Sequence, residues 1–255
     1  ENDVLNIFRD EKAYLTGHFL LSSGLHSPNY MQCALVFQKP WVAEKLCREL
    51  AKKLKGHKID AVIATGSNNS SRFFDYYFKS YPHIFRKNRN GVAVLTGEES
   101  KEEIEKLSDD IFLFFGLGCR NVSKIYVPQG YSFEHWADWT GKYKDLAEHN
   151  KYRNNLDYNY AIYLINSVPH INLGHLILKE DEAIASRIAC LHYEFYQDKN
   201  DLIGKLENHR EEIQCVVSEK SIPGWDHVSP GQSQHPALDQ YADGVDTMQF
   251  LTSLL

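Results

Sequence analysis

Apolar and polar residues form two different patterns along this 255-residue chain. In the first pattern apolar residues recur every three to four positions, which predicts amphipathic helices. The second pattern is a short continuous apolar run, which is typical of a buried strand. Residues 40–54 form the clearest helical pattern, because Pro40 suits a first turn and apolar residues from Val42 to Leu54 share one stripe. The run IDAVIA at residues 59–64 is the clearest strand.

The same patterns predict alternating elements along the rest of the chain. Helices are expected over residues 2–15, 71–78, 98–115, 131–149, 199–210 and 246–254. Strands are expected over residues 19–23, 30–37, 91–95, 124–127, 160–165, 176–178, 188–195 and 213–217. Residues 218–236, rich in Ser, Pro, Gly and His, predict a loop. This alternation predicts an α/β fold with a largely parallel or mixed sheet.

Composition and net charge argue against several classes of protein. With 43% hydrophobic and 24% charged residues the chain has material for a core, which excludes intrinsic disorder. A net charge of −6 argues against a nucleic-acid or anionic-membrane binder. The longest apolar run, residues 111–117, is far shorter than the roughly 20 residues of a membrane span. Neither a nucleic-acid partner nor a membrane span is therefore expected.

The cysteines and histidines bear on compartment and metal binding. The five cysteines are odd in number and none forms a C-x-x-C pair, which argues against a disulfide framework or a zinc ribbon. Free thiols persist in a reducing compartment, so a cytoplasmic location is expected. The twelve histidines show no metal-ligand spacing, and no metal site is predicted.

Cys119, in the segment FFGLGCRNVSK, is the candidate nucleophile. Gly116 and Gly118 precede it and would let a substrate carbonyl approach, while Arg120 follows it and would favour a thiolate. The alternative interpretation is a small buried residue, as most lone cysteines are. The other cysteines lie in apolar or helical runs, where that alternative is preferred.

The turn Thr65-Gly66-Ser67 lies between a predicted strand and a predicted helix. The unsatisfied N–H groups of a helix N-terminus can bind an anion, so this turn is a candidate phosphate cradle. The commoner interpretation is an ordinary helix cap.

Residues 2–64 resemble the N-terminal region of orotate phosphoribosyltransferases, through VLNIFRD and the long segment AYLTGHFLLSSGLHSPNYMQCALVFQKPWVAEKLCRELAKKLK. The resemblance implies a small cap over an orotate site, with the Ser22-Ser23-Gly24 turn retained. That family's diphosphate-binding loop, of the form VVDDVITTG, is absent from this sequence, as is its mobile loop with a catalytic lysine. Because the transfer depends on positioning both substrates over the core, the cap alone is not expected to catalyse it.

Residues 59–255 resemble acyl-CoA reductases of the LuxC type, in the aldehyde dehydrogenase superfamily. The motifs are IDAVIATGSNNSSRFFDYYF, PHIFRKNRNGVAVLTGEE, DIFLFFGLGCRNVSKIYVP, KYRNNLDYNYAIYL, KEDEAIAS and YADGVDTMQFL. Both families could supply IDAVIA, so the chain is interpreted as a chimera joined there. Residues 1–63 would be a small α+β phosphoribosyltransferase-type fragment, and residues 64–255 an aldehyde dehydrogenase-like catalytic region.

The second resemblance implies a reaction and a set of roles. The Cys119 thiolate would attack an acyl-CoA thioester, and NADPH would reduce the acyl-enzyme to an aldehyde. Thr65, Gly66 and Ser67 would meet the cofactor diphosphate, and Glu182 a cofactor ribose. The hydrolytic glutamate expected about 34 residues before Cys119 is replaced by Phe85, which fits a reductase. The superfamily's C-terminal assembly implies a possible homo-oligomer.

The sequence leaves two other functions open, and the chimeric interpretation has two consequences. The chain could be an orotate phosphoribosyltransferase-like transferase, or a non-catalytic fusion product. Most of the reductases' dinucleotide-binding half is replaced, so Cys119 is expected to accept an acyl group while NADPH turnover is weak or absent. The N-terminal fragment would lack its usual partner surface, which predicts exposed apolar side chains at Val42, Leu46 and Leu50.

Overall fold

A computed structural model describes residues 2–21 and 24–255. The chain forms two compact units, Glu1–Ile59 and Asp60–Leu255. Of the retained turn inferred by resemblance, Ser22 and Ser23 lie outside the described residues.

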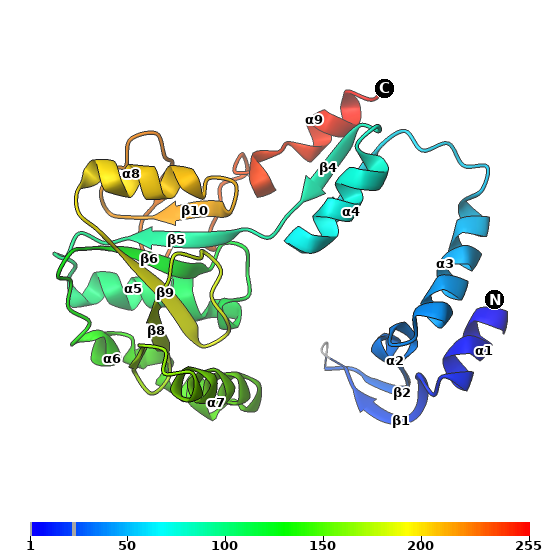
Figure 1. Cartoon of the computed structure of the whole chain (residues 1–255), viewed down its shortest axis with the longest axis horizontal. Helices are drawn as coiled ribbons and strands as arrows, with labels where there is room; N and C mark the ends of the chain where they lie inside the picture. Colours follow the sequence, from blue (N-terminus) through cyan, green and yellow to red (C-terminus); the bar gives the residue numbers. More distant parts are fainter. Residues whose placement is uncertain (1, 22–23) are drawn as a thin grey trace. The chain divides into compact units, whose positions relative to one another are not determined.

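The first unit is a small α+β structure (Figure 1). Its elements are α1 (Asn2–Asp10), β1 (Tyr14–Leu20), β2 (His26–Met31), α2 (Cys33–Phe37) and α3 (Pro40–Leu54). The two strands pair antiparallel as a hairpin. Helix α3 has the predicted bounds, whereas the strand predicted over residues 30–37 is wrong because its second half is helical.

A small core in this unit corrects the expected exposure of α3. Val42 is buried, and it packs with Ile7 and Phe8 of α1 and with Val36 of α2. Leu46 is partly buried against the same cluster. Only Leu50, with 58% of its surface exposed, behaves as expected. The prediction failed at Val42 because the short neighbouring helices cover the stripe locally.

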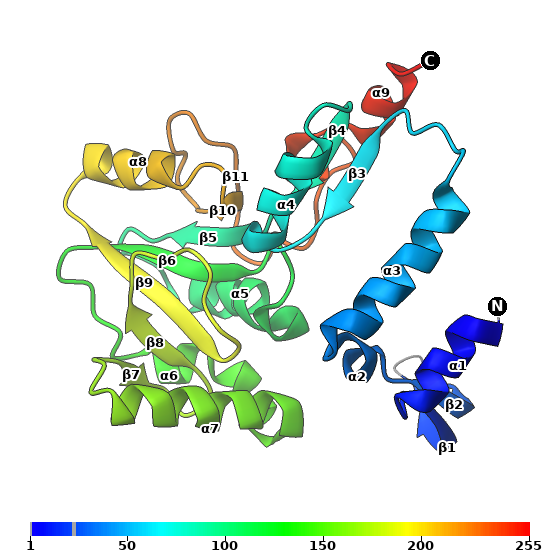
Figure 2. The same cartoon turned by 45° about the vertical axis from the view of Figure 1, so that its right-hand side comes forward.

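The second unit contains the remaining elements, traced in Figures 1 and 2. Its strands are β3 (Val62–Thr65), β4 (His83–Arg86), β5 (Asn90–Val94), β6 (Val122–Pro128), β7 (Ile171–Asn172), β8 (Ile177–Glu180), β9 (Cys190–Tyr196), β10 (Ile213–Val217) and β11 (His227–Val228). Its helices are α4 (Asn68–Phe78), α5 (Lys101–Phe112), η1 (Leu113–Gly116), α6 (Trp136–Trp139), η2 (Gly141–Glu148), α7 (Asn150–Ile165), α8 (Lys199–Asn208), η3 (Ala242–Gly244) and α9 (Thr247–Thr252).

A seven-stranded mixed sheet organises this unit, in the order β11-β10-β5-β6-β9-β8-β7. Every neighbouring pair is parallel except the antiparallel β7–β8 pair. Strands β3 and β4 form a separate two-stranded parallel sheet that is connected through α4. The predicted α/β class with a mixed sheet is therefore confirmed.

Helices cover both faces of the seven-stranded sheet, with α8 on one face and α5, α6 and α7 on the other (Figure 2). The alternation of β6 explains this: Ile125 packs in the core beneath α5 and α7, whereas Tyr126 packs in the core beneath α8. Among the residues described, no helix is long and apolar enough to cross a membrane.

The strand predicted over residues 160–165 is wrong, because these residues are the last turns of α7. The segment YAIYLI is rich in β-branched and aromatic residues, which favour strands in isolation. Tyr152, Leu156 and Tyr163 nevertheless lie on one helical face, and all three are buried in the core of the sheet. Burial of this helical face against the sheet therefore outweighed the strand propensity of the segment.

Candidate functional site

Cys119 lies on the loop between η1 and β6, and its side chain is exposed. The chain turns sharply before it, since Phe114, Phe115 and Gly116 have φ angles of 55°, 58° and 73°. Gly118 is held close to a side chain: a Cβ there would lie 2.7 Å from Asn121 Oδ1. The two glycines singled out in the sequence therefore serve the turn as well as access to the thiol.

Asn121, which is fully buried, ties this loop to helix α5. Its Oδ1 accepts a hydrogen bond from the Gly118 N–H at 2.9 Å, and its Nδ2 donates to the Asp110 carbonyl at 2.7 Å. Both polar ends of the amide are thus satisfied in a place that water does not reach. The Gly118 N–H is already hydrogen-bonded to Asn121, so it is not available to a substrate.

Asp110 of α5 and Arg120 of the Cys119 loop both bind the loop that contains Gly231 and Ser233. The Asp110 carboxylate accepts the Gly231 N–H at 2.6 Å and the Ser233 N–H at 2.9 Å. Arg120 Nε donates to the Ser233 carbonyl. Burial raises the pKa of Asp110, although the hydrogen bonds from Ser233 and Gly231 oppose that rise. We call Asp110, Asn121, Arg120 and Ser233 the loop clamp.

The five thiols differ in access and in their surroundings. Burial raises the pKa of Cys215 to about 11, and burial also raises the pKa of Cys190. Cys33 and Cys47 are exposed, but both lie on helices of the first unit. Cys119 is therefore the accessible thiol of the second unit, and the alternative interpretation of a buried structural cysteine is wrong.

The Thr65-Gly66-Ser67 turn joins β3 to α4, as predicted. Ser67 Oγ accepts the Ser70 N–H at 3.2 Å, and the Gly66 N–H donates to the Arg86 carbonyl at 3.1 Å. A Cβ at Gly66 would lie 2.8 Å from the Ser70 Cβ. The turn therefore acts as a helix cap, and one of its amides is already used within the β3–β4 sheet.

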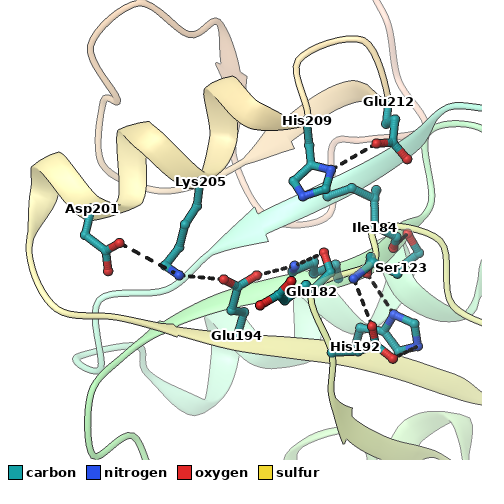
Figure 3. Close-up of polar contacts among 12 residues, drawn as sticks. Ser123, Glu182, Ile184, His192, Glu194, Asp201, Lys205, His209 and Glu212 are labelled. Carbon is teal, nitrogen blue, oxygen red and sulfur yellow. Dashed lines mark hydrogen bonds and ion pairs between the residues drawn. The ribbon is translucent and has the colours of Figure 1, made fainter.

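Glu182 lies just after β8, next to a buried ion-pair chain (Figure 3). Its backbone carbonyl accepts a hydrogen bond from Lys124 Nζ at 2.6 Å. Lys124, on β6, is completely buried and also donates to the Glu194 carboxylate. Lys205 reaches the other Glu194 oxygen at 2.6 Å. This arrangement was not anticipated, although a lysine inside the apolar strand VSKIYVP could have indicated it.

Burial and mutual contact shift the pKa values of the groups in this ion-pair chain. Burial lowers the pKa of Lys124, against the opposing effect of Glu194. Burial alone would raise the pKa of Glu194, but the hydrogen bonds from Lys124 and Lys205 outweigh it and hold that pKa below its ordinary value of 4.5. Glu194 is thus the shared acceptor of both lysines, and their hydrogen bonds favour its ionised form.

The predicted cofactor residues do not come together. Glu182 lines an open hollow of about 830 Å³ with three other carboxylates and the Lys205 ammonium, and its described lining includes neither Cys119 nor the 65–67 turn. Four carboxylates and one ammonium leave this hollow with an excess of negative charge, which disfavours a diphosphate. Dinucleotide sites also need several βαβ units, whereas β3, α4 and β4 supply one. Glu182 and the 65–67 turn therefore do not line one hollow, and their joint role in binding a cofactor stays a prediction of the resemblance. Nor do any three His, Cys, Asp or Glu residues in the described ranges gather as a metal site.

Curated proteins with similar sequences are orotate phosphoribosyltransferases. That of Carboxydothermus hydrogenoformans is 52% identical over 64 residues, covering 25% of this chain and 34% of the relative. That of Bartonella henselae is 52% identical over 137 residues, covering 50% of this chain and 69% of the relative, which extends the match beyond the 2–64 segment. The chain spans between about a third and about half of the first relatives. No protein-family model matches it.

Solved structures with a similar fold are aldehyde dehydrogenases and an oxidoreductase. The oxidoreductase from Marinobacter aquaeolei is 13% identical with a TM-score of 0.46, covering 74% of this chain and 49% of that one. Indole-3-acetaldehyde dehydrogenase of P. syringae, in complex with NAD+, is 10% identical with a TM-score of 0.45, covering 63% and 40%. At this distance the two structures say nothing about the activity of this chain.

Proposed function

This chain belongs to the orotate phosphoribosyltransferase family, whose relatives match as much as half of its length, and we propose that its reactive chemistry lies at Cys119, in residues 60–255. The proposed reaction is the acyl-transfer step of an acyl-CoA reductase. The observation that carries it is an exposed thiol on a loop clamped at both sides by buried polar residues. A nucleophile needs this combination of access and fixed position.

The step is a thioester exchange. The Cys119 thiolate attacks the carbonyl carbon of an acyl-CoA, the bond from that carbon to the coenzyme A sulfur breaks, and the departing thiolate takes up a proton. The product is an acyl-enzyme thioester on Cys119, and no further reactant is required. The loop clamp acts as positioning machinery, because it holds the turn that carries the thiol.

NADPH would supply the hydride that turns such an intermediate into an aldehyde in a whole reductase, as the sequence resemblance implies. Ser67 of the 65–67 turn caps its own helix, and Glu182 lines a hollow that this turn does not reach. The proposal is therefore limited to acyl transfer, and NADPH turnover is expected to be weak or absent. NAD+ is present in a distant solved neighbour, and a nicotinamide cofactor for this chain would need residues beyond these four.

Mass spectrometry of the intact chain after incubation with a long-chain acyl-CoA tests the proposal. We expect a mass increase of one acyl group that Cys119→Ser abolishes. Cys47→Ser is the matched control, because Cys47 is also exposed but lies on α3 of the first unit, and it should keep the adduct. An adduct that persists in Cys119→Ser, or no adduct in the unaltered chain, would contradict acyl transfer at Cys119.

An orotate phosphoribosyltransferase-like transferase is the second candidate, and the 52% identity of its relatives favours it. This chain, however, lacks the acidic loop with which such a transferase would hold the ribose diphosphate. Thermal shift separates the candidates, because a ligand that binds only the folded state raises the melting temperature. Stabilisation by acyl-CoA favours the first candidate, stabilisation by orotate favours the second, and neither effect indicates a non-catalytic fusion product.

A further inference from the structure

Cys215 is a second thiol beside the reactive loop, and neither the loop clamp nor the proposed acyl transfer uses it. It lies on β10 and is partly exposed, where it lines an open cavity of about 500 Å³. Its S–H donates a hydrogen bond to the Arg120 carbonyl at 3.6 Å. Arg120 directly follows Cys119 in the sequence. A strand from a distant part of the chain therefore brings a thiol to the turn that carries the candidate nucleophile.

Cys119 and Arg120 are the two central residues of a tight turn. The Asn121 N–H donates to the Gly118 carbonyl at 3.0 Å, and this hydrogen bond closes the turn around them. Consecutive Cα atoms lie only about 3.8 Å apart, so Cys119 is one peptide unit from the contact with Cys215. Burial is the main reason that the pKa of Cys215 is raised, and the nearby Cys119 adds to that rise. The two thiols are thus close enough for their charges to interact.

Gly91 of β5 makes this approach possible. It is the register partner of Cys215 on the neighbouring strand β10, and its N–H donates to the Asn121 carbonyl at 2.8 Å. A Cβ at position 91 would lie 2.6 Å from the Arg120 carbonyl oxygen, which is shorter than an ordinary carbon–oxygen contact. Side chains of paired residues lie on the same face of a sheet. The missing side chain of Gly91 therefore leaves the space in which the Arg120 carbonyl meets the Cys215 thiol.

Two neighbouring thiols allow an oxidation that a single thiol does not. We infer that Cys119 and Cys215 form a disulfide when the chain meets a peroxide. The Cys119 thiolate attacks a peroxide oxygen, the O–O bond breaks, and the departing hydroxide takes up a proton, which leaves a sulfenic acid on Cys119. The Cys215 sulfur then attacks the sulfenic sulfur, the S–O bond breaks, and the released hydroxide leaves as water with the Cys215 proton. The two thiols lose two electrons, and the peroxide gains them.

The disulfide removes the nucleophile from the reactive loop in a reversible form. A sulfenic acid without a partner thiol goes on to the irreversible sulfinic acid, whereas a disulfide is reduced again by a dithiol. Transient disulfides of this kind serve redox sensing in reducing compartments. The bond forms independently of acyl transfer, but its effect on activity rests on the proposed function.

Peptide mapping of the full chain tests the bond directly. After treatment with hydrogen peroxide, the remaining thiols are alkylated and the chain is cleaved with trypsin without reduction. The tryptic peptides 107–120 and 211–220 contain one cysteine each, Cys119 and Cys215. We expect these two peptides to be joined in chains that migrate as monomers on a non-reducing gel, and dithiothreitol to separate them. Two separate peptides with Cys119 oxidised, or Cys119 joined to a different cysteine, would overturn the inference.

Cys215→Ser removes the partner thiol and keeps the nucleophile. After peroxide treatment its Cys119 should be trapped by dimedone as a sulfenic acid, and with excess peroxide it should become a sulfinic acid that dithiothreitol does not reverse. Before oxidation the variant should accept an acyl group as the unaltered chain does, which shows that it is folded. Cys47→Ser is the matched control, because Cys47 is an exposed thiol of the first unit, and it should still give the joined peptides.

Acylation before and after oxidation separates this inference from the proposed function. Peroxide should block acylation of the unaltered chain by a long-chain acyl-CoA, and dithiothreitol should restore it. Joined peptides in a chain that accepts no acyl group when reduced would support the disulfide and contradict acyl transfer. Acylation of the reduced chain without joined peptides after oxidation would support acyl transfer and contradict the disulfide.

Discussion

Single residues show how the second unit tolerates buried charge. Lys124 has no exposed surface, and Glu194 is the carboxylate that it shares with the more exposed Lys205. Removing the carboxylate of such a pair leaves the lysine charge buried without a partner. Replacing the buried lysine by an apolar residue leaves no unpaired charge, because the carboxylate keeps its second lysine. The two partners should therefore differ in what their loss costs.

Glu194→Gln is expected to lower the free energy of unfolding by about 3 kcal/mol, because it leaves the Lys124 ammonium buried without a carboxylate. Lys124→Met should change it by about 1 kcal/mol or less, because Glu194 keeps Lys205. Urea unfolding at neutral pH measures both. Equal losses in the two variants would contradict this account of the pair.

The same carboxylate predicts a pH dependence. The folded-state pKa of Glu194 lies below its ordinary value of 4.5, so its stabilising effect is complete above about that pH. It is lost as the pH falls through the lower folded-state value. The unaltered chain should therefore lose more stability than Glu194→Gln between pH 6 and pH 3, as followed by urea midpoints. Glu134→Gln, at an exposed position, should follow the unaltered chain.

At the scale of elements, the Cys119 loop is held by contacts to elements far along the sequence. Asn121 connects it to α5, Arg120 connects it to the loop at Ser233, and Asp110 of α5 binds that second loop as well. A loop that carries a nucleophile is otherwise among the more mobile parts of a structure. Buried hydrogen bonds thus hold a turn that the local sequence would leave adaptable.

Asn121→Ala is expected to cost about 2 kcal/mol, since it removes two buried hydrogen bonds and leaves the Gly118 N–H unpaired. Hydrogen exchange of residues 116–121 should become faster. Asn155→Ala is the control, because Asn155 makes an exposed contact to the Lys151 carbonyl within α7. Protection of residues 116–121 that is the same in both variants would rule out Asn121 as the anchor.

At the scale of the whole molecule, the chain consists of two units with separate cores. The first has about 60 residues and a core of five buried apolar side chains, so its burial is limited. The second contains two larger cores on the two faces of its sheet. Units that differ this much in core size are expected to unfold at different denaturant concentrations.

Val42→Ala should lower the stability of residues 2–59 alone, by about 2 kcal/mol, because Val42 is buried in the first core. Val92→Ala should act only on residues 60–255, since Val92 is fully buried in the larger unit. Hydrogen exchange at increasing urea concentrations distinguishes the two sets of peptides. A single transition shared by both units in both variants would contradict independent unfolding.

Features that depend on neighbours along the chain could be predicted from the sequence alone. The helix at Pro40–Leu54, the α/β class, the β3–α4 turn and the candidate thiol at Cys119 follow from periodicity, capping residues and residue type. Backbone geometry over a few residues determines such patterns. The likeness to orotate phosphoribosyltransferases was also visible there, and the curated relatives confirm it.

Only the tertiary structure decided which distant residues meet. It places Asp110 against Ser233, covers Val42 with its neighbouring helices, turns residues 160–165 into helix and brings a second thiol to the reactive loop. It also places Glu182 in a hollow that the 65–67 turn does not line, although the sequence resemblance assigns both to one cofactor. The physical reason is that burial and hydrogen bonding between remote segments depend on the packing of whole elements, which local patterns do not encode.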